Sequence, residues 1–559
     1  MKSLHKLSLT LVVFATLAAC NRKPDTPPLP KTSEAPAATP VAVATADDAI
    51  AWRRGDVDTA FAEARAANKP VFLYWGADWC PPCNQMKATL FKTQAFVERT
   101  QHFVPVYVDG DTPAAQQLGS RFSVSGYPTM VLFRPDGTEI TRLPGEAEPE
   151  RYLQVLAMSM NAARPVKATL KTALGDGKGL TQDDWRMLAW YSWDTDDQQL
   201  VPTAQVPATL QRLAAQCPSG FDEPRARLML KTMAAAGDAA PRTPVNGKEE
   251  PRLKVDRKAM LAQVEAVLAT PKSARENFDL LTGAMPAMVR ATTVAGTPAR
   301  KRLLAEADRT LSRLAGDAGL SNTDRLGATI ARVQLATIDT KPVGKNDKAE
   351  PVVLPEALRA AVVAEAARAD RESTDPYERQ TVINAAAYLL GTAGLLDRSD
   401  ALLEAELSRS HSPYYFMLDL AANAQKRGDK AAAIDWYAKA YDAAKGPATR
   451  LQWGSTYVTA LIDLAPDAAA RIEQAAGQVI GEIAPSPESF DGRNRRSLSR
   501  IAAKVAAWNA DGRHADEANR IAEASRKLCD RVPAAASERV RCGELLKVGS
   551  PMNKPRDAA

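Results

Sequence analysis

Two cysteines, Cys80 and Cys83, flank two prolines in the stretch YWGADWCPPCNQM, residues 74–86. Thiols at this spacing can supply half of a zinc site, form a static disulfide, or open and close a disulfide reversibly. A structural zinc site needs four ligands, and neither a second C-x-x-C nor an H-x-x-x-H pattern occurs in the chain. A two-residue loop at a helix start is a labile place for a static disulfide. The pattern therefore favours a redox-active pair, with no metal ion and no cofactor.

The elements around the motif would place it at the edge of a sheet. Residues 71–75 are apolar, β-branched or aromatic throughout, which is typical of a strand buried on both faces. Cys80 follows this strand and opens a helix. Open α/β sheets carry their reactive groups at the carboxyl ends of strands, where Cys80 is expected. Further strands are predicted at 103–108, 129–133 and 139–143, and further helices at 57–67, 114–120 and 149–163.

A cysteine at a helix N-terminus is suited to nucleophilic chemistry. Unpaired backbone N–H groups and the helix dipole stabilise a thiolate there and lower the pKa of the cysteine. Pro81 and Pro82 have no N–H, so two donors that could stabilise a Cys80 thiolate are missing. No histidine lies between the cysteines either. Both features favour a reducing couple, and hence a reductase or a disulfide shuffler rather than a primary oxidase.

Residues 48–163 resemble the thioredoxin superfamily, and in pattern most closely the C-terminal periplasmic thioredoxin-like domain of the transmembrane disulfide-interchange proteins. The resemblance covers about a fifth of the chain and is carried by these residues: Lys69-Pro70-Val71, Ala77-Asp78-Trp79-Cys80-Pro81-Pro82-Cys83, Val108-Asp109, Gly126-Tyr127-Pro128-Thr129, Pro135-Asp136-Gly137 and Gly145.

The resemblance assigns roles to individual residues. It implies that Cys80 is the attacking thiol, reachable and more exposed than its partner, and that Cys83 is the resolving thiol on the buried side of the helix. Pro128 would be a cis-proline that packs against the disulfide, and Trp79, Tyr127 and Pro128 would contact the substrate. Protein thiols and disulfides are the implied substrates, with a periplasmic or inner-membrane partner that donates or accepts electrons.

One position departs from the family pattern. Thioredoxins usually hold a buried aspartate six residues before the first cysteine, and this chain has Tyr74 there. The nearest carboxylate is Asp78. Asp78 could move the resolving proton through water, or it could be a solvated loop charge, and the sequence leaves both alternatives open.

The N-terminus predicts export and a lipid anchor. Residues 1–19 combine a basic start with a short apolar run, which is typical of a signal peptide. Leu-Ala-Ala-Cys20 resembles the lipobox of bacterial lipoproteins, which implies lipidation of Cys20; the alternative is an ordinary signal that leaves a free cysteine. Asn21 after the cysteine implies the outer membrane, on its periplasmic face. Residues 20–47 are rich in Pro and Ala and predict an extended tether.

Residues 165–547 predict a large all-α domain. Helical patterns rich in Ala, Leu, Arg and Glu follow one another. Residues 414–444, two helices with a turn at Gly428-Asp429, resemble a tetratricopeptide repeat, so a solenoid-like array is expected. Loops are predicted at 237–255 and 341–355, and a disordered tail at 548–559. Thr181 and Asp184 predict a helix-capping box.

Outside the motif, other cysteines and charges are open to several interpretations. Cys529 and Cys542 flank a probable turn and could form a structural disulfide, whereas Cys217 is expected to be a buried apolar residue. Four arginines on one predicted helix could bind an anionic partner, but a solvated helix face is favoured: Arg493, Arg495, Arg496 and Arg500.

The sequence as a whole predicts a lipid-anchored periplasmic thiol–disulfide oxidoreductase whose helical domain selects or positions protein partners. A formal charge of +6 over 559 residues gives no reason to expect a nucleic-acid partner. The alternative is a helical-repeat scaffold lipoprotein in which the thioredoxin module has little or no catalytic activity.

Overall fold

The computed structural model describes residues 49–124, 126–145, 147–196, 199–237, 256–340, 351–533 and 536–546. The predicted signal peptide, Cys20, the tether and the predicted tail lie outside these residues, as do positions 238–255 and 341–350 of the two predicted loops. Within the described residues, no helix combines the length and the apolar character that crossing a membrane requires.

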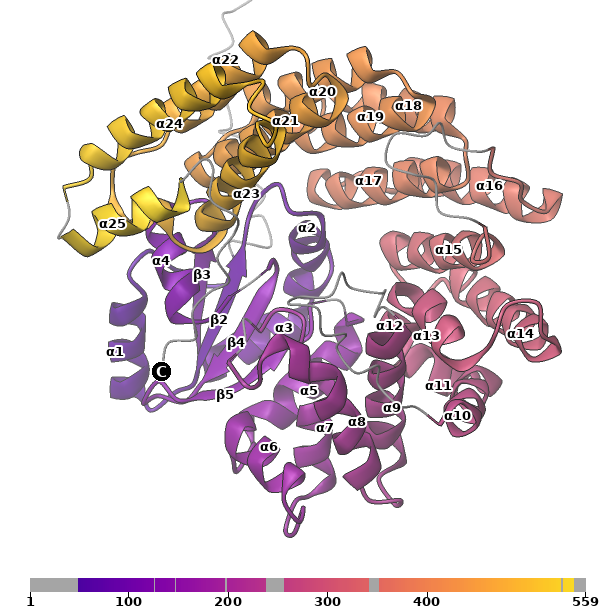
Figure 1. Ribbon diagram of the computed structural model, residues 1–559. Helices are drawn as coiled ribbons and strands as arrows, with labels where there is room; N and C mark the ends of the chain where they lie inside the picture. Colours follow the sequence, from indigo (N-terminus) through magenta and orange to yellow (C-terminus); the bar gives the residue numbers. More distant parts are fainter. Residues whose placement is uncertain are drawn as a thin grey trace, which may run out of the picture. The chain divides into compact units, whose positions relative to one another are not determined.

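A five-stranded sheet forms the N-terminal part of the described chain (Figure 1). Its strands run in the order β1-β3-β2-β4-β5, with β2 parallel to β3 and antiparallel to β4. Every residue of β2 is buried, as the uninterrupted apolar pattern predicted. The strand bounds are β1 Arg53–Arg54, β2 Val71–Gly76, β3 Val104–Asp109, β4 Thr129–Phe133 and β5 Glu139–Leu143.

Helices cover both faces of this sheet. Apolar residues of α1 (Val57–Ala67) and α4 (Pro113–Arg121) pack with one face of β2, β3 and β4. Those of α2 (Pro81–Ala88), α3 (Gln94–Arg99) and α5 (Pro149–Met160) lie in the cluster on the other face. The result is a thioredoxin-like α/β domain, which confirms the predicted fold class. The short strand β1 and the helix α3 were not predicted.

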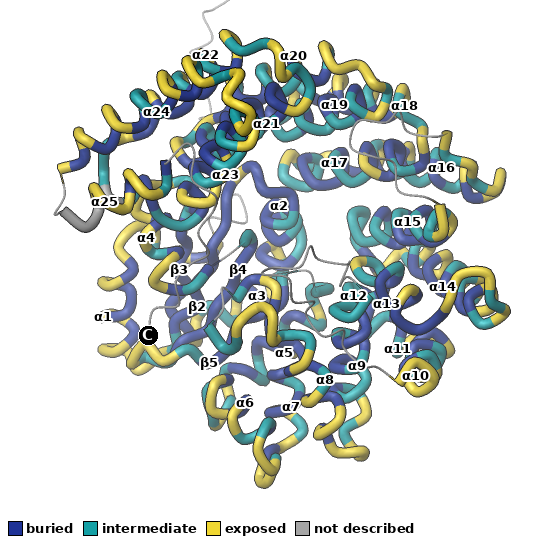
Figure 2. Tube along the Cα trace, viewed as in Figure 1, coloured by how far each residue is buried: buried dark blue, intermediate teal, exposed yellow. Residues whose placement is uncertain are grey.

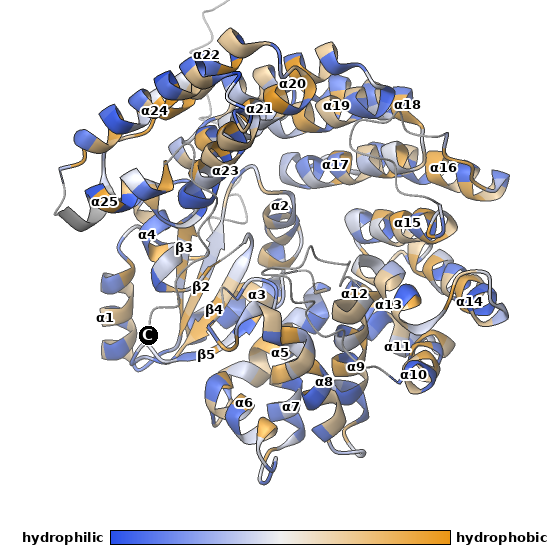
Figure 3. Ribbon diagram, in the orientation of Figure 1, coloured by the Kyte–Doolittle hydropathy of each residue, from blue (hydrophilic) through white to orange (hydrophobic). Residues whose placement is uncertain are grey.

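The rest of the described chain is largely helical, as predicted, and its helices carry both hydrophilic and hydrophobic residues (Figure 3). The helices are α6 Val166–Leu174, α7 Gln182–Trp190, α8 Val206–Gln216, α9 Asp222–Gly237, α10 Arg257–Ala269, α11 Pro271–Glu276, α12 Phe278–Gly283, α13 Met285–Thr292, α14 Pro298–Ala315, α15 Asn322–Ala336, α16 Glu356–Glu372, α17 Pro376–Thr392, α18 Leu396–Glu406, α19 Pro413–Arg427, α20 Lys430–Ala443, α21 Pro447–Leu464, α22 Ala469–Gly481, α23 Gly492–Trp508, α24 Ala515–Asp530 and α25 Ala536–Leu545. Short 3-10 turns are η2 Leu90–Lys92, η3 Thr100–His102, η4 Thr203–Gln205 and η5 Pro487–Phe490.

Local signals in this region give the expected turns and caps. Gly428 ends α19 with φ +79°, a left-handed conformation that favours glycine, and Asp429 caps α20 through Ala432 N. The predicted capping box between Thr181 and Asp184 starts α7. A tetratricopeptide repeat in the strict sense stays a prediction.

Two features hold the later helices in place. Cys529 of α24 and Cys542 of α25 form a disulfide. The later helices also return to the α/β domain: α17 packs against α2, and α23 and η5 pack against α4. Figure 2 shows α2 as a buried helix although it begins at the predicted reactive cysteine. The C-terminal region therefore packs against the helix that carries the candidate site.

Candidate active site

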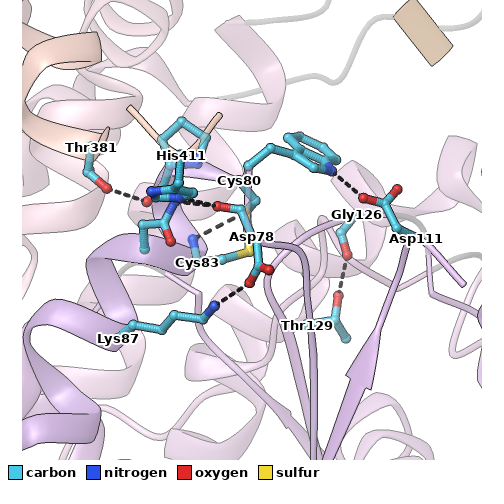
Figure 4. The surroundings of a disulfide bond; sticks show 12 residues. Asp78, Cys80, Cys83, Lys87, Asp111, Gly126, Thr129, Thr381 and His411 are labelled. Atoms are coloured by element: carbon cyan, nitrogen blue, oxygen red, sulfur yellow. Dashed lines mark hydrogen bonds and ion pairs between the residues drawn. A yellow bond between two sulfur atoms is a disulfide. The ribbon is translucent and has the colours of Figure 1, made fainter. Parts of the chain in front are cut away.

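The paired cysteines begin helix α2, as predicted (Figure 4). Cys80 is the N-cap residue, and Cys83 lies in the first turn. The two sulfurs form a disulfide across a Cα–Cα distance of 5.2 Å. The backbone N–H of Cys83 donates to Cys80 Sγ at 3.2 Å. Because Pro81 and Pro82 have no N–H, this is the donor in the first turn that remains for the Cys80 sulfur.

Cys80 is the more exposed of the two cysteines, as expected, but it is buried and its sulfur is not reachable in this arrangement of the chain. Cys80 is 2% exposed and Cys83 is 0% exposed. The thioredoxin-like domain alone does not explain this burial. Residues of the C-terminal helices belong to the same buried cluster as Cys80, among them Tyr414 and Trp453.

The peptide bond between Tyr127 and Pro128 is cis, as the resemblance implied. Thr129 Oγ1 donates to Gly126 O at 2.8 Å and bridges the residues on either side of this bond. The ring of Tyr127 lies edge-on to Trp79, with 5.9 Å between ring centroids. The structure therefore brings Trp79, Tyr127 and Pro128 to the same end of the sheet as the cysteines.

Asp78 forms an ion pair rather than a free loop charge. Its carboxylate lies 2.8 Å from Lys87 Nζ, and the Asp78 side chain is 71% exposed while that of Lys87 is 7% exposed. Partial burial acts to raise the pKa of Asp78, but the charges of Lys87, His411 and Arg54 outweigh it and lower the pKa. An ionised, ion-paired Asp78 is a weak proton acceptor, which counts against a role in resolution in this state.

The position that holds an aspartate in thioredoxins is closed by aromatic packing. Tyr74 is 1% exposed and its ring contacts those of Phe91 and Tyr107, at centroid distances of 4.9 and 5.4 Å. Asp109, which pairs with Gly76 across β2 and β3, was not predicted as a site residue. Burial raises the pKa of Asp109, and the charges of Asp111 and Asp78 add to the shift. The carboxylate of Asp109 therefore binds a proton more readily than that of Asp78.

Three residues of the C-terminal region contact the motif. Thr381 and His411 were not singled out in the sequence, and Arg493 was singled out only as a member of an arginine cluster. Thr381 Oγ1 of α17 donates to Pro81 O at 2.6 Å. His411 Nε2, just before α19, lies 3.0 Å from Asp78 O (Figure 4). Arg493 of α23 forms an ion pair with Asp111 and is 7% exposed. The predicted solvated face is thus wrong for Arg493, while Arg495, Arg496 and Arg500 are exposed.

Comparison with known proteins supports the assignment of this domain. Residues 57–158 match the thioredoxin-like domain family. Over 90 residues the chain is 36% identical to the thiol:disulfide interchange protein DsbD 1 of Pseudomonas aeruginosa, covering 15% of this chain and 14% of that protein. DsbD of Pseudomonas fluorescens is 32% identical over 103 residues, 18% of each chain. DsbD of Actinobacillus pleuropneumoniae is 34% identical over 92 residues, 16% of each.

These matches set the extent of what the relatives can indicate. The chain spans less than a fifth of the length of these three relatives. Within the α/β domain, the paired cysteines, the helix N-terminus and the cis-proline can support exchange of a disulfide with another thiol pair. No cluster of three or more His, Cys, Asp or Glu side chains that could hold a metal ion occurs among the described residues.

Proposed function

We propose that this protein is a thiol–disulfide oxidoreductase that exchanges the Cys80–Cys83 disulfide with protein substrates. The observation that carries the proposal is the disulfide at the start of α2, at the same end of the sheet as a cis-proline peptide, in a domain that matches the thioredoxin-like family. The relatives that resemble part of this chain are named thiol:disulfide interchange proteins, which supports the proposal.

The exchange would take two steps from the reduced protein. The Cys80 thiolate attacks a substrate disulfide, the Cys80–substrate bond forms, and the released substrate sulfur takes up a proton. Cys83 then loses its proton and attacks Cys80 Sγ, which forms the Cys80–Cys83 bond and releases the second substrate thiol. Two electrons pass from the dithiol to the substrate disulfide. A dithiol protein donor must supply two electrons and two protons before the next cycle.

The scarcity of hydrogen-bond donors around Cys80 supports the reductive direction. A strongly oxidising pair stabilises its reduced form through a strongly stabilised thiolate. Here Pro81 and Pro82 supply no donors, and Cys83 N supplies one at 3.2 Å. We therefore propose reduction or shuffling of substrate disulfides. Export, lipidation at Cys20 and attachment to the periplasmic face of the outer membrane belong to the same proposal, and the sequence of residues 1–21 supports them.

Reduction of insulin disulfides by the full chain, with dithiothreitol as the electron source, tests the activity. The rate should exceed the uncatalysed rate, and Cys80→Ser should abolish the excess. Cys217→Ser is the matched control, because Cys217 is a free, buried cysteine. Cys83→Ala should accumulate a mixed disulfide on Cys80, visible by mass spectrometry.

A scaffold function is the second candidate, and one observation favours it. With Cys80 2% exposed, no substrate disulfide can reach its sulfur in this arrangement. A scaffold would show no insulin reduction in the wild type or in variants that expose Cys80, and Cys83→Ala would trap nothing.

A further inference from the structure

The cover over Cys80 is made by five side chains from separate parts of the helical region. We call them the closing surface: Thr381, His411, Tyr415, Trp453 and Arg493. Thr381 and His411 bond the backbone on either side of Cys80, at Pro81 O and Asp78 O. The other three lie against Trp79.

The aromatic part of this surface encloses Trp79. The ring of Tyr415 stacks on Trp79 with 6.1 Å between centroids, and Trp453 meets it edge-on at 5.8 Å. Trp79 is only 8% exposed as a result. By the resemblance, Trp79 and Tyr127 are the residues that a substrate would contact. The closing surface thus lies where the substrate would bind.

Arg493 fills the remaining space. Its guanidinium lies 5.2 Å from the Trp79 ring centroid and 5.3 Å from that of Tyr127. Asp111 accepts hydrogen bonds from Arg493 and from Thr449 of α21, and also from Trp79 Nε1 at 3.1 Å. One carboxylate of the α/β domain therefore ties two C-terminal helices to the tryptophan that precedes Cys80.

The contact between the closing surface and the α/β domain leaves some buried polar atoms of the described residues without a hydrogen bond. Nε and Nη1 of Arg493, Nε1 of Trp453 and Oδ1 of Asn494 are buried and have no hydrogen-bond partner among the residues that the structure describes. Each such atom disfavours the covered state, because water would bond it once the surfaces part. Much of the surrounding contact is also polar, including Gln85–Ser321 at 2.7 Å and Lys92–Asp375 at 2.6 Å. Polar contacts between domains are compatible with separation, since water can replace them.

We propose that the closing surface is an intramolecular competitor of the substrate. In the closed state it covers Cys80, Trp79 and Tyr127, and a protein partner must displace it before a disulfide can reach Cys80 Sγ. The apparent affinity for substrate is then reduced by the fraction of molecules that are open. This inference rests on the proposed function, because only an exchange reaction gives the covered site a substrate.

The test uses two variants, each designed to open the closed state, whose substitutions lie far apart in the sequence. Arg493→Ala removes the ion pair with Asp111 and the two cation–π contacts with Trp79 and Tyr127. Thr381→Val with His411→Ala removes the two bonds beside Cys80. Arg500→Ala is the matched control, because Arg500 is an exposed arginine on the same helix as Arg493. Circular dichroism of each full-length variant establishes that it is folded.

The first readout is alkylation of Cys80 by iodoacetamide in the reduced full chain, followed by peptide mass spectrometry. Loss of a hydrogen bond to a charged group corresponds to about tenfold or more in an equilibrium constant. Arg493→Ala should therefore raise the alkylation rate about tenfold or more. The Thr381/His411 variant should raise it by a smaller factor, and Arg500→Ala should leave it within about twofold. Equal rates in all four proteins would overturn the proposal.

The second readout is insulin reduction as a function of insulin concentration. Competition predicts that kcat/KM rises by the same factor as the alkylation rate, whereas kcat at saturating insulin stays unchanged. A change in kcat alone would contradict competition. Faster alkylation with no insulin reduction in any variant would support closure and remove the proposed function. Insulin reduction at equal kcat/KM in all variants would keep the function and remove the closure.

Discussion

The side chain of Arg142 should carry an unusually large share of the stability of the α/β domain. It lies on β5 and is 0% exposed. Its guanidinium donates to Ser123 O at 2.6 Å, to Thr195 O at 3.1 Å and to Phe122 O. Phe122 and Ser123 belong to the segment that leads to the cis-proline. Arg142 therefore joins this segment to the start of the helical region.

Replacing Arg142 by methionine tests this role. Methionine fills much of the space but leaves three carbonyl oxygens without their donor and the Glu139 carboxylate without its cation, although Gln199 Nε2 still donates to it. Removing one partner of a buried ion pair typically costs about 3–5 kcal/mol. We expect Arg142→Met to lower the free energy of unfolding by an amount in this range.

Urea denaturation followed by tryptophan fluorescence measures the loss. Arg134→Met is the control, because Arg134 makes one exposed bond, to Ala163 O at 2.9 Å. The control should cost about 1 kcal/mol or less. If Arg142→Met cost no more than Arg134→Met, the buried guanidinium would not be holding these segments together.

Two further predictions concern the helical region. Burial raises the pKa of Asp419 to about 7, against the bond from Asn384 and the charge of Lys426. The folded state then binds the proton more tightly than the unfolded state, so this contribution to stability is full below about pH 4 and is lost as pH rises through about 7. Asp419→Asn should therefore stabilise the protein at pH 8, by at most about 4 kcal/mol, and flatten the pH profile of urea unfolding; a profile like that of the exposed control Asp442→Asn would contradict this. Replacing Cys529 and Cys542 together by alanine should cost about 2–4 kcal/mol in the same assay, since the disulfide closes a loop of sequence separation 13, and a cost below about 1 kcal/mol would show that the bond contributes little.

Much of the local structure could be predicted from the sequence. The apolar run of β2, the helix that opens at Cys80 and the turn at Gly428 all depend on residues close together in the chain. Hydrophobic periodicity and turn residues report such features directly. The cis bond at Pro128 followed from the motif that surrounds it.

The carboxylate near the site was harder to predict. The family pattern directed attention to Tyr74 and Asp78, whereas the carboxyl whose pKa is raised is that of Asp109, half-buried at the end of β3. Its burial depends on which strand pairs with β2, and local sequence patterns do not predict that pairing.

The sequence by itself determined that a thiol pair begins a helix at the edge of an α/β sheet and that a long helical region follows. Only the tertiary structure decided that this region covers the pair. Hydropathy shows that a helix face is buried but does not show what buries it. Arg493 illustrates the difference, because Arg495, Arg496 and Arg500 of the same helix are exposed while Arg493 pairs with Asp111, 382 residues away in the chain. A contact across that separation is set by how the whole chain packs.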